Sequence, residues 1–156
     1  METLAPASTV RHTTLAVRTS RAVEFVDLTD RLDALLGQAD IRVGLVNIQS
    51  LHTTVAITVN EHEPLLLADF AAVLEHAAPH RASYRHDDLS VRTVNVTADE
   101  RVNGHAHCQA LLLGPSVCLN VIDGRLRIGR WQRVFLVELD GPREREISIV
   151  LLESGR

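Results

Sequence analysis

The sequence predicts an α+β fold: a largely antiparallel β-sheet sandwich with helices packed on it, in a single domain. Its 156 residues suffice for one domain with a real core, and 46% of them are hydrophobic. Strand-like and helical segments come first, and a long run of strand-like segments follows. That order favours an α+β domain over strict alternation of strand and helix. Residues 1–10 are small and polar and are expected to form a flexible tail, which leaves 11–156 as the domain.

The first part of the domain is expected to give two strands and a helix. Segments 14–19 and 24–28 have the composition of short strands. Leucines spaced three and four residues apart then predict a helix. Thr29 or Asp30 is the expected cap of this helix, and Gly37 its expected end.

The middle of the chain is expected to give two more strands and the longest helix. Segment 41–49 alternates between apolar and polar residues, and 55–59 is rich in β-branched residues. The polar cluster 50–54 lies between them, where side chains can project toward a ligand. Pro64 suits the first turn of a helix. The following 65–78 is apolar on nearly every side, so we expect this helix to be covered on both flanks.

The last part is expected to be mostly sheet. Segment 82–102 is polar and rich in Asp, which predicts a long functional loop with one short strand. A helix over 105–113 follows, and Asp123-Gly124 marks a hairpin within 116–128. Strands over 131–139 and 146–152 complete the predicted sheet.

Composition excludes several classes of function. The net charge of -4 argues against a nucleic-acid binder, which would show a basic stripe. No apolar run approaches a membrane span and no signal peptide is recognisable, so we expect a cytoplasmic protein with no membrane partner. The chain contains no lysine, which excludes Schiff-base chemistry and leaves arginine as the only permanent cation for anion binding. Cys108 and Cys118 have apolar neighbours and are expected to be buried thiols.

Three histidines are the candidate reactive groups. His52, His86 and His107 stand in three separate segments beside polar neighbours. Three imidazoles with an open fourth position are a catalytic zinc arrangement, although their spacing forms no compact ligand motif. Asp69 is either a carboxylate that holds a histidine tautomer or a charge on a helix surface. Trp131 is expected in the core rather than as a stacking platform.

At these residues the chain resembles the YjbQ-like family, named for secondary thiamine-phosphate synthase activity. The matching stretches, in the family's order, are His52-Thr53-Thr54, Asn60-Glu61, Asp69, Tyr84-Arg85-His86, Asn103-Gly104-His105-Ala106-His107, Leu113-Gly114-Pro115-Ser116, Gly124-Arg125-Leu126, Gly129-Arg130-Trp131-Gln132 and Asp140-Gly141-Pro142-Arg143. They span about Arg11 to Glu153, and their specificity comes from the set rather than from any one stretch.

The resemblance implies a compact α+β homotrimer with a polar pocket that holds the family's histidines. It implies a weak ability to join a pyrimidine diphosphate and a thiazole phosphate into thiamine phosphate, as a main or a side activity. Transferred residue by residue, it implies a catalytic set of His52, His86, His107 and Asp69. Independently of the resemblance, the three imidazoles of His52, His86 and His107 predict a site for a divalent metal, zinc or magnesium. The implied ligand-binding residues are Thr53, Thr54, Glu61, Asn103, Gly114, Trp131, Gln132 and Arg143.

Two positions depart from the family pattern and affect substrate identity more than fold. The family usually has Asp where this chain has His105, and Thr where it has Arg130. A pocket-facing Arg130 would add a phosphate-binding cation, whereas an outward Arg130 would be neutral for binding.

Three functions compete at this stage. The first is an enzyme that acts on phosphorylated small molecules, the second a non-catalytic protein that binds a metal or a phosphorylated metabolite, and the third a structural assembly module. We expect the pocket to bind an oxyanion through Arg143, because a guanidinium presents a planar fork of donors to phosphate. The alternative is a surface ion pair of Arg143 with Glu138 or Asp140.

Overall fold

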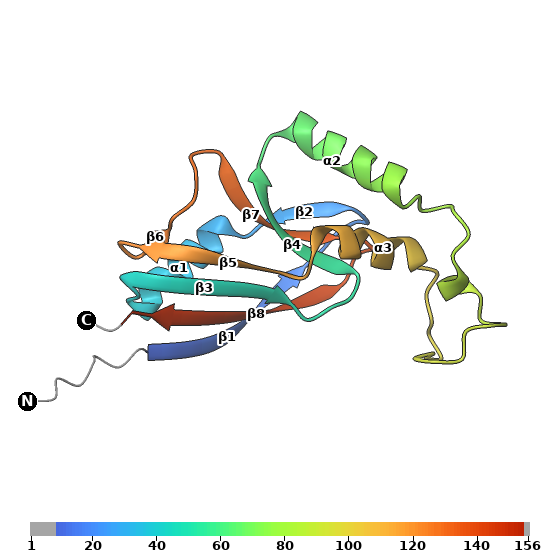
Figure 1. The fold of residues 1–156 in the computed structure, drawn as a ribbon, viewed down its shortest axis with the longest axis horizontal. Helices are drawn as coiled ribbons and strands as arrows, with labels where there is room; N and C mark the ends of the chain where they lie inside the picture. Colours follow the sequence, from blue (N-terminus) through green and yellow to red (C-terminus); the bar gives the residue numbers. More distant parts are fainter. Residues whose placement is uncertain (1–8, 155–156) are drawn as a thin grey trace, which may run out of the picture.

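The computed structural model describes residues 9–154 as two antiparallel sheets with helices around them (Figure 1). The elements in chain order are β1 (Thr9–Arg18), β2 (Glu24–Asp27), α1 (Thr29–Ala39), β3 (Val43–Ser50), β4 (Val55–Glu61), α2 (Pro64–Ala77), the 3₁₀ turn η1 (Arg85–Asp87), α3 (Gly104–Leu113), β5 (Ser116–Ile122), β6 (Arg125–Leu126), β7 (Gln132–Glu138) and β8 (Glu144–Glu153). Most of the expected tail lies outside the described residues, while Thr9 and Val10 pair with β8.

The sheets confirm the predicted fold class. The larger has strand order β1-β8-β3-β5-β6 and the smaller β2-β7-β4, and every strand pair is antiparallel. Side chains from both sheets and from α1 share the main core, which includes Ile48, Ile147, Leu136 and Leu32. In β8 the buried residues alternate with accessible ones, so one face of the strand points into this core.

Helix α1 departs from its predicted ends. Thr29 is its first residue rather than its cap, and the helix continues past Gly37 to Ala39. It ends because Asp40 adopts a left-handed backbone with φ 52°, which lets its N–H reach the carbonyls of the last turn. Glycine propensity therefore located the end of α1 one turn too early.

Helix α2 begins at Pro64 as expected, and the Glu63 side chain caps it by accepting hydrogen bonds from two backbone N–H groups. The prediction that both flanks are covered is wrong for the single chain. Only Leu74 is fully buried, whereas Leu65 is 76% and Val73 64% exposed. One side packs on Phe25 and α3, and the other side faces outward.

The segment between α2 and α3 contains η1 and no strand, contrary to the short strand expected there. It projects from the body as an arm (Figure 1), and a half-buried ion pair between Arg92 and Glu100 (2.6 Å) ties its two sides together. The hairpin at Asp123-Gly124 is confirmed, with positive φ at both residues, as a two-residue hairpin turn requires.

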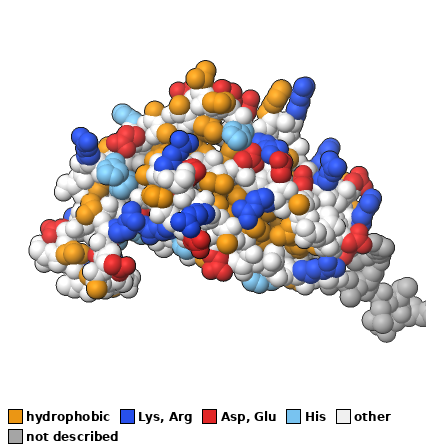
Figure 2. Space-filling model, turned by 180° about the vertical axis from the view of Figure 1, so that it is seen from behind, with side chains coloured by type: hydrophobic (Ala, Val, Ile, Leu, Met, Phe, Trp, Pro, Cys, Tyr) orange, Lys and Arg blue, Asp and Glu red, His pale blue; other side chains and the backbone are white. Residues whose placement is uncertain are grey.

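The surface mixes charge signs. Figure 2 shows basic side chains lying among acidic and hydrophobic ones on the face that it draws. Both cysteines, Cys108 and Cys118, are exposed, so the expectation of buried thiols is wrong: each lies on the outward side of its element. No helix of residues 9–154 has the length and apolar character needed to cross a membrane.

Candidate functional site

A cleft opens between the β3–β4 turn and α3, and we call it the His cleft. Its lining residues are Gln49, Ser50, Leu51, His52, Thr53, Val55, His107, Ala110, Leu111 and Pro115. The volume of the cleft is about 510 Å³. The structure thus brings two of the three predicted histidines, with Thr53, to one cleft.

Hydrogen bonds with the nearby backbone orient the His52 imidazole, which accepts through its ring nitrogen Nε2. Its Nε2 accepts the backbone N–H of Glu146 at 2.8 Å, and Ser50 Oγ accepts the backbone N–H of His52 at 3.1 Å. Burial, helped by the positive charge of Arg145, lowers the pKa of His52 below its usual value. The proton of the neutral ring therefore lies on Nδ1.

His107 and His86 form a pair beside the cleft. Their ring centroids are 4.5 Å apart with the planes inclined at 60°. Arg92 donates to His86 Nε2 at 3.2 Å, so this nitrogen also acts as an acceptor. Burial and the neighbouring His86 lower the pKa of His107. The imidazoles of His52 and His107 are accordingly neutral at pH 7.

These contacts do not fit a metal ion held by the three histidines within one chain. Nε2 of His52 and Nε2 of His86 are already occupied by N–H donors. In the described part of the chain, no three His, Cys, Asp or Glu side chains converge as a metal-binding group would. We therefore assign no step of the chemistry to a metal.

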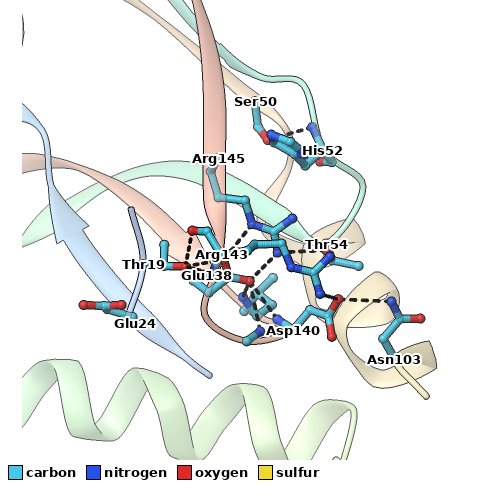
Figure 3. Close-up of polar contacts among 12 residues, drawn as sticks. Thr19, Glu24, Ser50, His52, Thr54, Asn103, Glu138, Asp140, Arg143 and Arg145 are labelled. Carbon is cyan, nitrogen blue, oxygen red and sulfur yellow. Dashed lines mark hydrogen bonds and ion pairs between the residues drawn. The ribbon is translucent and has the colours of Figure 1, made fainter. Parts of the chain in front are cut away.

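A buried ion pair lies behind the cleft. Arg145 donates to both carboxylate oxygens of Glu138, at 2.5 and 2.6 Å, and also to Thr54 Oγ1 at 3.2 Å. The same carboxylate accepts the Thr19 hydroxyl and the backbone N–H groups of residues 139–141 (Figure 3). Burial alone would raise the pKa of Glu138, but Arg145 and these donors lower it. Glu138 thereby fixes the turn that carries Asp140 and Arg143.

Asp140 links this turn to α3. Its carboxylate, only 2% exposed, contacts Arg143 (2.6 Å), Arg101 (3.3 Å) and the side-chain amide of Asn103 (3.1 Å), as Figure 3 shows for Arg143 and Asn103. Arg143 therefore forms the ion pair with Asp140 that was the alternative to oxyanion binding. Two guanidinium groups share one carboxylate, however, so one positive charge is left uncompensated. The buried Oδ1 of Asn103 has no hydrogen-bond partner among the described residues.

Helix α3 begins where the arm packs against it. Asp87 accepts the backbone N–H groups of Asn103 (3.0 Å) and Gly104 (2.9 Å). Asn103 precedes the helix with φ -142°, outside the left-handed region. A Cβ on Gly104 would lie 2.5 Å from Tyr84 Cβ, so close packing explains the glycine.

The remaining predicted residues do not line the His cleft. Thr54 is buried, and its hydroxyl oxygen accepts a hydrogen bond from Arg145. Gly114 has φ 87° and ends α3, and its backbone carbonyl accepts the N–H of Ile57. Asp69 is exposed on α2, away from the cleft residues. Gln132 accepts the Gly129 N–H at 2.7 Å, at the start of β7.

Glu61 and Trp131 line a second cleft, which we call the Trp cleft. Its residues are Asp27, Glu61, His62, Glu63, Pro64, Arg130, Trp131 and Arg133, around a volume of about 550 Å³. Trp131 is 61% exposed, so its expected place in the core is wrong: the Arg130 guanidinium lies 4.6 Å from the centre of its ring. These two side chains, just before β7, thus contact each other at the surface.

The two departures from the family pattern lie outside the His cleft. His105 is buried against His80, with ring centroids 4.3 Å apart, and is hydrogen-bonded to the Leu139 backbone. Arg130 belongs to the Trp cleft. Neither residue lines the cleft that contains His107.

Sequence reasoning missed Arg145, Arg101 and Asp87 as organising residues. A signal existed for Arg145, since it shares the inward face of β8 with Ile147 and Ile149 at spacing two. A charge at such a position needs a buried partner. Arg101 and Asp87 lie in an irregular segment, where no periodicity indicates a direction.

Comparison with known proteins adds a family context. The family model described as UPF0047 protein YjbQ-like matches residues 13–154. A UPF0047 protein of Methanothermobacter thermautotrophicus is 40% identical over 135 residues, which cover 86% of this chain and 87% of that protein. A UPF0047 protein of Archaeoglobus fulgidus is 36% identical over 138 residues, covering 88% and 98%.

Solved structures show the same fold. The crystal structure of a YbjQ-like protein of unknown function from Sulfolobus solfataricus P2 superimposes with a TM-score of 0.83 at 34% identity, covering 94% of this chain and 99% of the other. A hypothetical protein from Aeropyrum pernix K1 gives 0.80 at 31% identity, covering 92% and 98%.

Proposed function

The chain belongs to the family described as UPF0047 protein YjbQ-like, and from this premise we propose that its His cleft binds the phosphate group of a small molecule and acts on it chemically. One observation carries the proposal. Arg143 and Arg101 share the single carboxylate of Asp140, and Arg143 lies close enough to His52 for its positive charge to lower the pKa of that imidazole. An anion-binding group next to proton acceptors suits a phosphorylated substrate.

The reaction that we propose is of the thiamine-phosphate synthase type. In it, the bond from the pyrimidine methylene carbon to the diphosphate oxygen breaks, and the thiazole nitrogen forms a new bond to that carbon. The diphosphate leaves with the electron pair of the broken bond, so its stabilisation needs positive charge more than a strong base. Arg143 lies outside the cleft lining, but its charge acts on His52 and would supply that stabilisation, while His107 in the lining would donate or accept a hydrogen bond.

Turnover of the two precursors tests this reaction. Wild-type protein and His107→Ala are incubated with the pyrimidine diphosphate and the thiazole phosphate, and thiamine phosphate is quantified by chromatography. We expect product from the wild type and at least a tenfold lower rate from His107→Ala, within the range of general acid–base contributions. Equal rates in both proteins, or no product from either, would contradict the proposed reaction.

A second function, non-catalytic binding, is favoured by a specific observation. The Nε2 atoms of His52 and His86 already accept hydrogen bonds, which leaves His107 as the accessible imidazole of the three. A binding protein of this kind would hold the phosphorylated metabolite, or a divalent zinc or magnesium ion, without turnover. Metal analysis of the purified protein and the turnover assay separate the two functions.

The proposal includes a closed homo-oligomer, a homotrimer, that works in the cytoplasm. Large apolar side chains stand exposed on several elements of the single chain, among them Leu65 on α2, Val102 before α3 and Leu111 on α3. Such surfaces are typical of proteins that associate. Light scattering at micromolar concentration tests the assembly, and a stable monomer would contradict it. Cell fractionation tests the compartment.

A further inference from the structure

The two clefts lie at opposite ends of one strand. Val55, the first residue of β4, lines the His cleft, and Glu61, its last residue, lines the Trp cleft. At about 3.3 Å per residue, the seven residues of β4 separate them by roughly 20 Å. One small ligand cannot contact both clefts of the same chain.

The surface around the Trp cleft has the character of a protein contact. Trp131 is 61% exposed and is held in place by Arg130. Trp and Arg are the residue types most enriched at the energetic centres of interfaces. In the described part of the chain, the Glu61 carboxylate forms no side-chain hydrogen bond or ion pair, although Asp27 beside it is paired with Arg133 and His62.

The rim of the His cleft is apolar and could receive the exposed Trp131 ring. Leu111 is 83% and Leu51 53% exposed, so apolar side chains border an open cleft. Arg143, which shares the Asp140 carboxylate with Arg101, lies close enough to His52 in this cleft for its positive charge to lower the pKa of that imidazole. An exposed aromatic ring with a free carboxylate fits an apolar rim with excess positive charge.

We infer that the Trp cleft surface of one copy of this chain docks over the His cleft of a second copy. Trp131 then closes the cleft between Leu51 and Leu111, and Glu61 faces the positive side of the cleft. The inference rests on the proposed function, because it supplies the missing wall of the same site. A second copy is the occupant because both complementary surfaces belong to this chain.

The docking contact also determines the symmetry of the assembly. Docking joins two different surfaces, so the contact is heterologous, and it forms a ring when the rotation between successive copies closes. Each copy then gives its Trp131 to one neighbour and receives another neighbour's Trp131 at its own His cleft. A three-membered ring contains three complete sites.

Cross-linking between engineered cysteines tests the contact directly. Both native cysteines are first replaced by serine, and Arg130→Cys is combined with Leu112→Cys, next to the rim. A short bifunctional thiol reagent should give covalent dimers and trimers of this double variant. Each single variant should stay monomeric on a denaturing gel, because like surfaces do not meet. The matched control pair is Arg130→Cys with Ala34→Cys on α1, which should also give none.

Two results would overturn the inference: no covalent oligomer from the Arg130→Cys/Leu112→Cys variant, or dimers from either single variant, which would show that like surfaces meet. The outcome is separable from that of the proposed function. Loss of phosphate affinity in Arg143→Ala without cross-links refutes only the docking. Cross-links with unchanged phosphate affinity in Arg143→Ala refute only phosphate binding.

Trp131 gives an independent readout, since it is the only tryptophan in the chain. Its fluorescence emission should shift to longer wavelength when the assembly is diluted to monomer. In Leu111→Glu, which places a carboxylate on the rim, the long-wavelength emission should appear at a concentration at least tenfold higher than in the wild type. Ala34→Glu should behave as the wild type. Emission that is independent of concentration would contradict the docking.

Discussion

At the scale of single residues, the buried carboxylate of Glu138 organises the site. It satisfies Arg145, a threonine hydroxyl and three consecutive backbone N–H groups. These contacts compensate the cost of burying two charges, and they fix the turn from which Asp140 and Arg143 reach toward α3. Removing the charge from one partner leaves the other buried without compensation.

Glu138→Gln is therefore expected to destabilise the fold by about 3–5 kcal/mol, the usual cost of breaking a buried pair. Urea unfolding at pH 7 measures the change in the free energy of unfolding. Glu144→Gln is the matched control, because the ion pair of Glu144 with Arg18 is exposed and should change stability by about 0.5 kcal/mol or less. A loss below about 1 kcal/mol for Glu138→Gln would show that the pair is not a stabilising centre.

The lowered pKa of Asp27 predicts that the free energy of unfolding depends on pH. Burial opposes its ionisation, but hydrogen bonds from Arg133, Thr29 and His62 lower its pKa from 3.8 to about 2. The folded pKa lies below the unfolded value. The contribution to stability, about 2 kcal/mol, is therefore fully present above pH 4 and is lost as the pH falls toward 2.

Urea unfolding at several pH values between 6 and 2 measures this contribution. Wild-type stability should fall across that interval more steeply than the stability of Asp27→Asn, which lacks the titrating group. Asp123→Asn serves as control, since Asp123 forms an exposed ion pair with Arg42. Parallel pH profiles for wild type and Asp27→Asn would refute the assignment.

At the scale of elements, the start of α3 depends on the close approach of the arm. Gly104 leaves no room for a Cβ beside Tyr84, and Asp87 of η1 caps the helix. These contacts link the arm to the helix that carries His107.

Gly104→Ala is expected to cost about 1–3 kcal/mol of unfolding free energy, because Tyr84 must move to admit the methyl group. Gly37→Ala in α1 is the matched control. A Cβ there meets nothing within 4 Å, and alanine in a helix should stabilise by about 0.5–1 kcal/mol. Equal effects of the two substitutions in urea unfolding would contradict the packing argument.

At the scale of the whole molecule, sequence patterns predicted the fold class, the antiparallel sheets and the Asp123-Gly124 hairpin, because periodicity and turn chemistry are local. The family resemblance predicted that His52 and His107 belong to a site. Sequence patterns could not predict the exposure of Trp131 or of the outer side of α2, because the burial of these side chains depends on which other elements pack against them in the folded protein. Nor could they find the contacts of Asp140 with Arg101 and Asn103, which join two segments distant in sequence.

Calorimetric titration with inorganic phosphate and with thiamine phosphate tests the central claim, phosphate binding at the His cleft, most directly. Arg143→Ala should weaken binding by roughly 1.5–3 kcal/mol, a tenfold to hundredfold loss, as expected for a charged hydrogen bond. Arg143→Lys should fall between this variant and the wild type, because lysine keeps the charge but lacks the planar fork. The exposed Arg125→Ala, remote on β6, should leave affinity unchanged. Equal affinities for wild type and Arg143→Ala would contradict the claim.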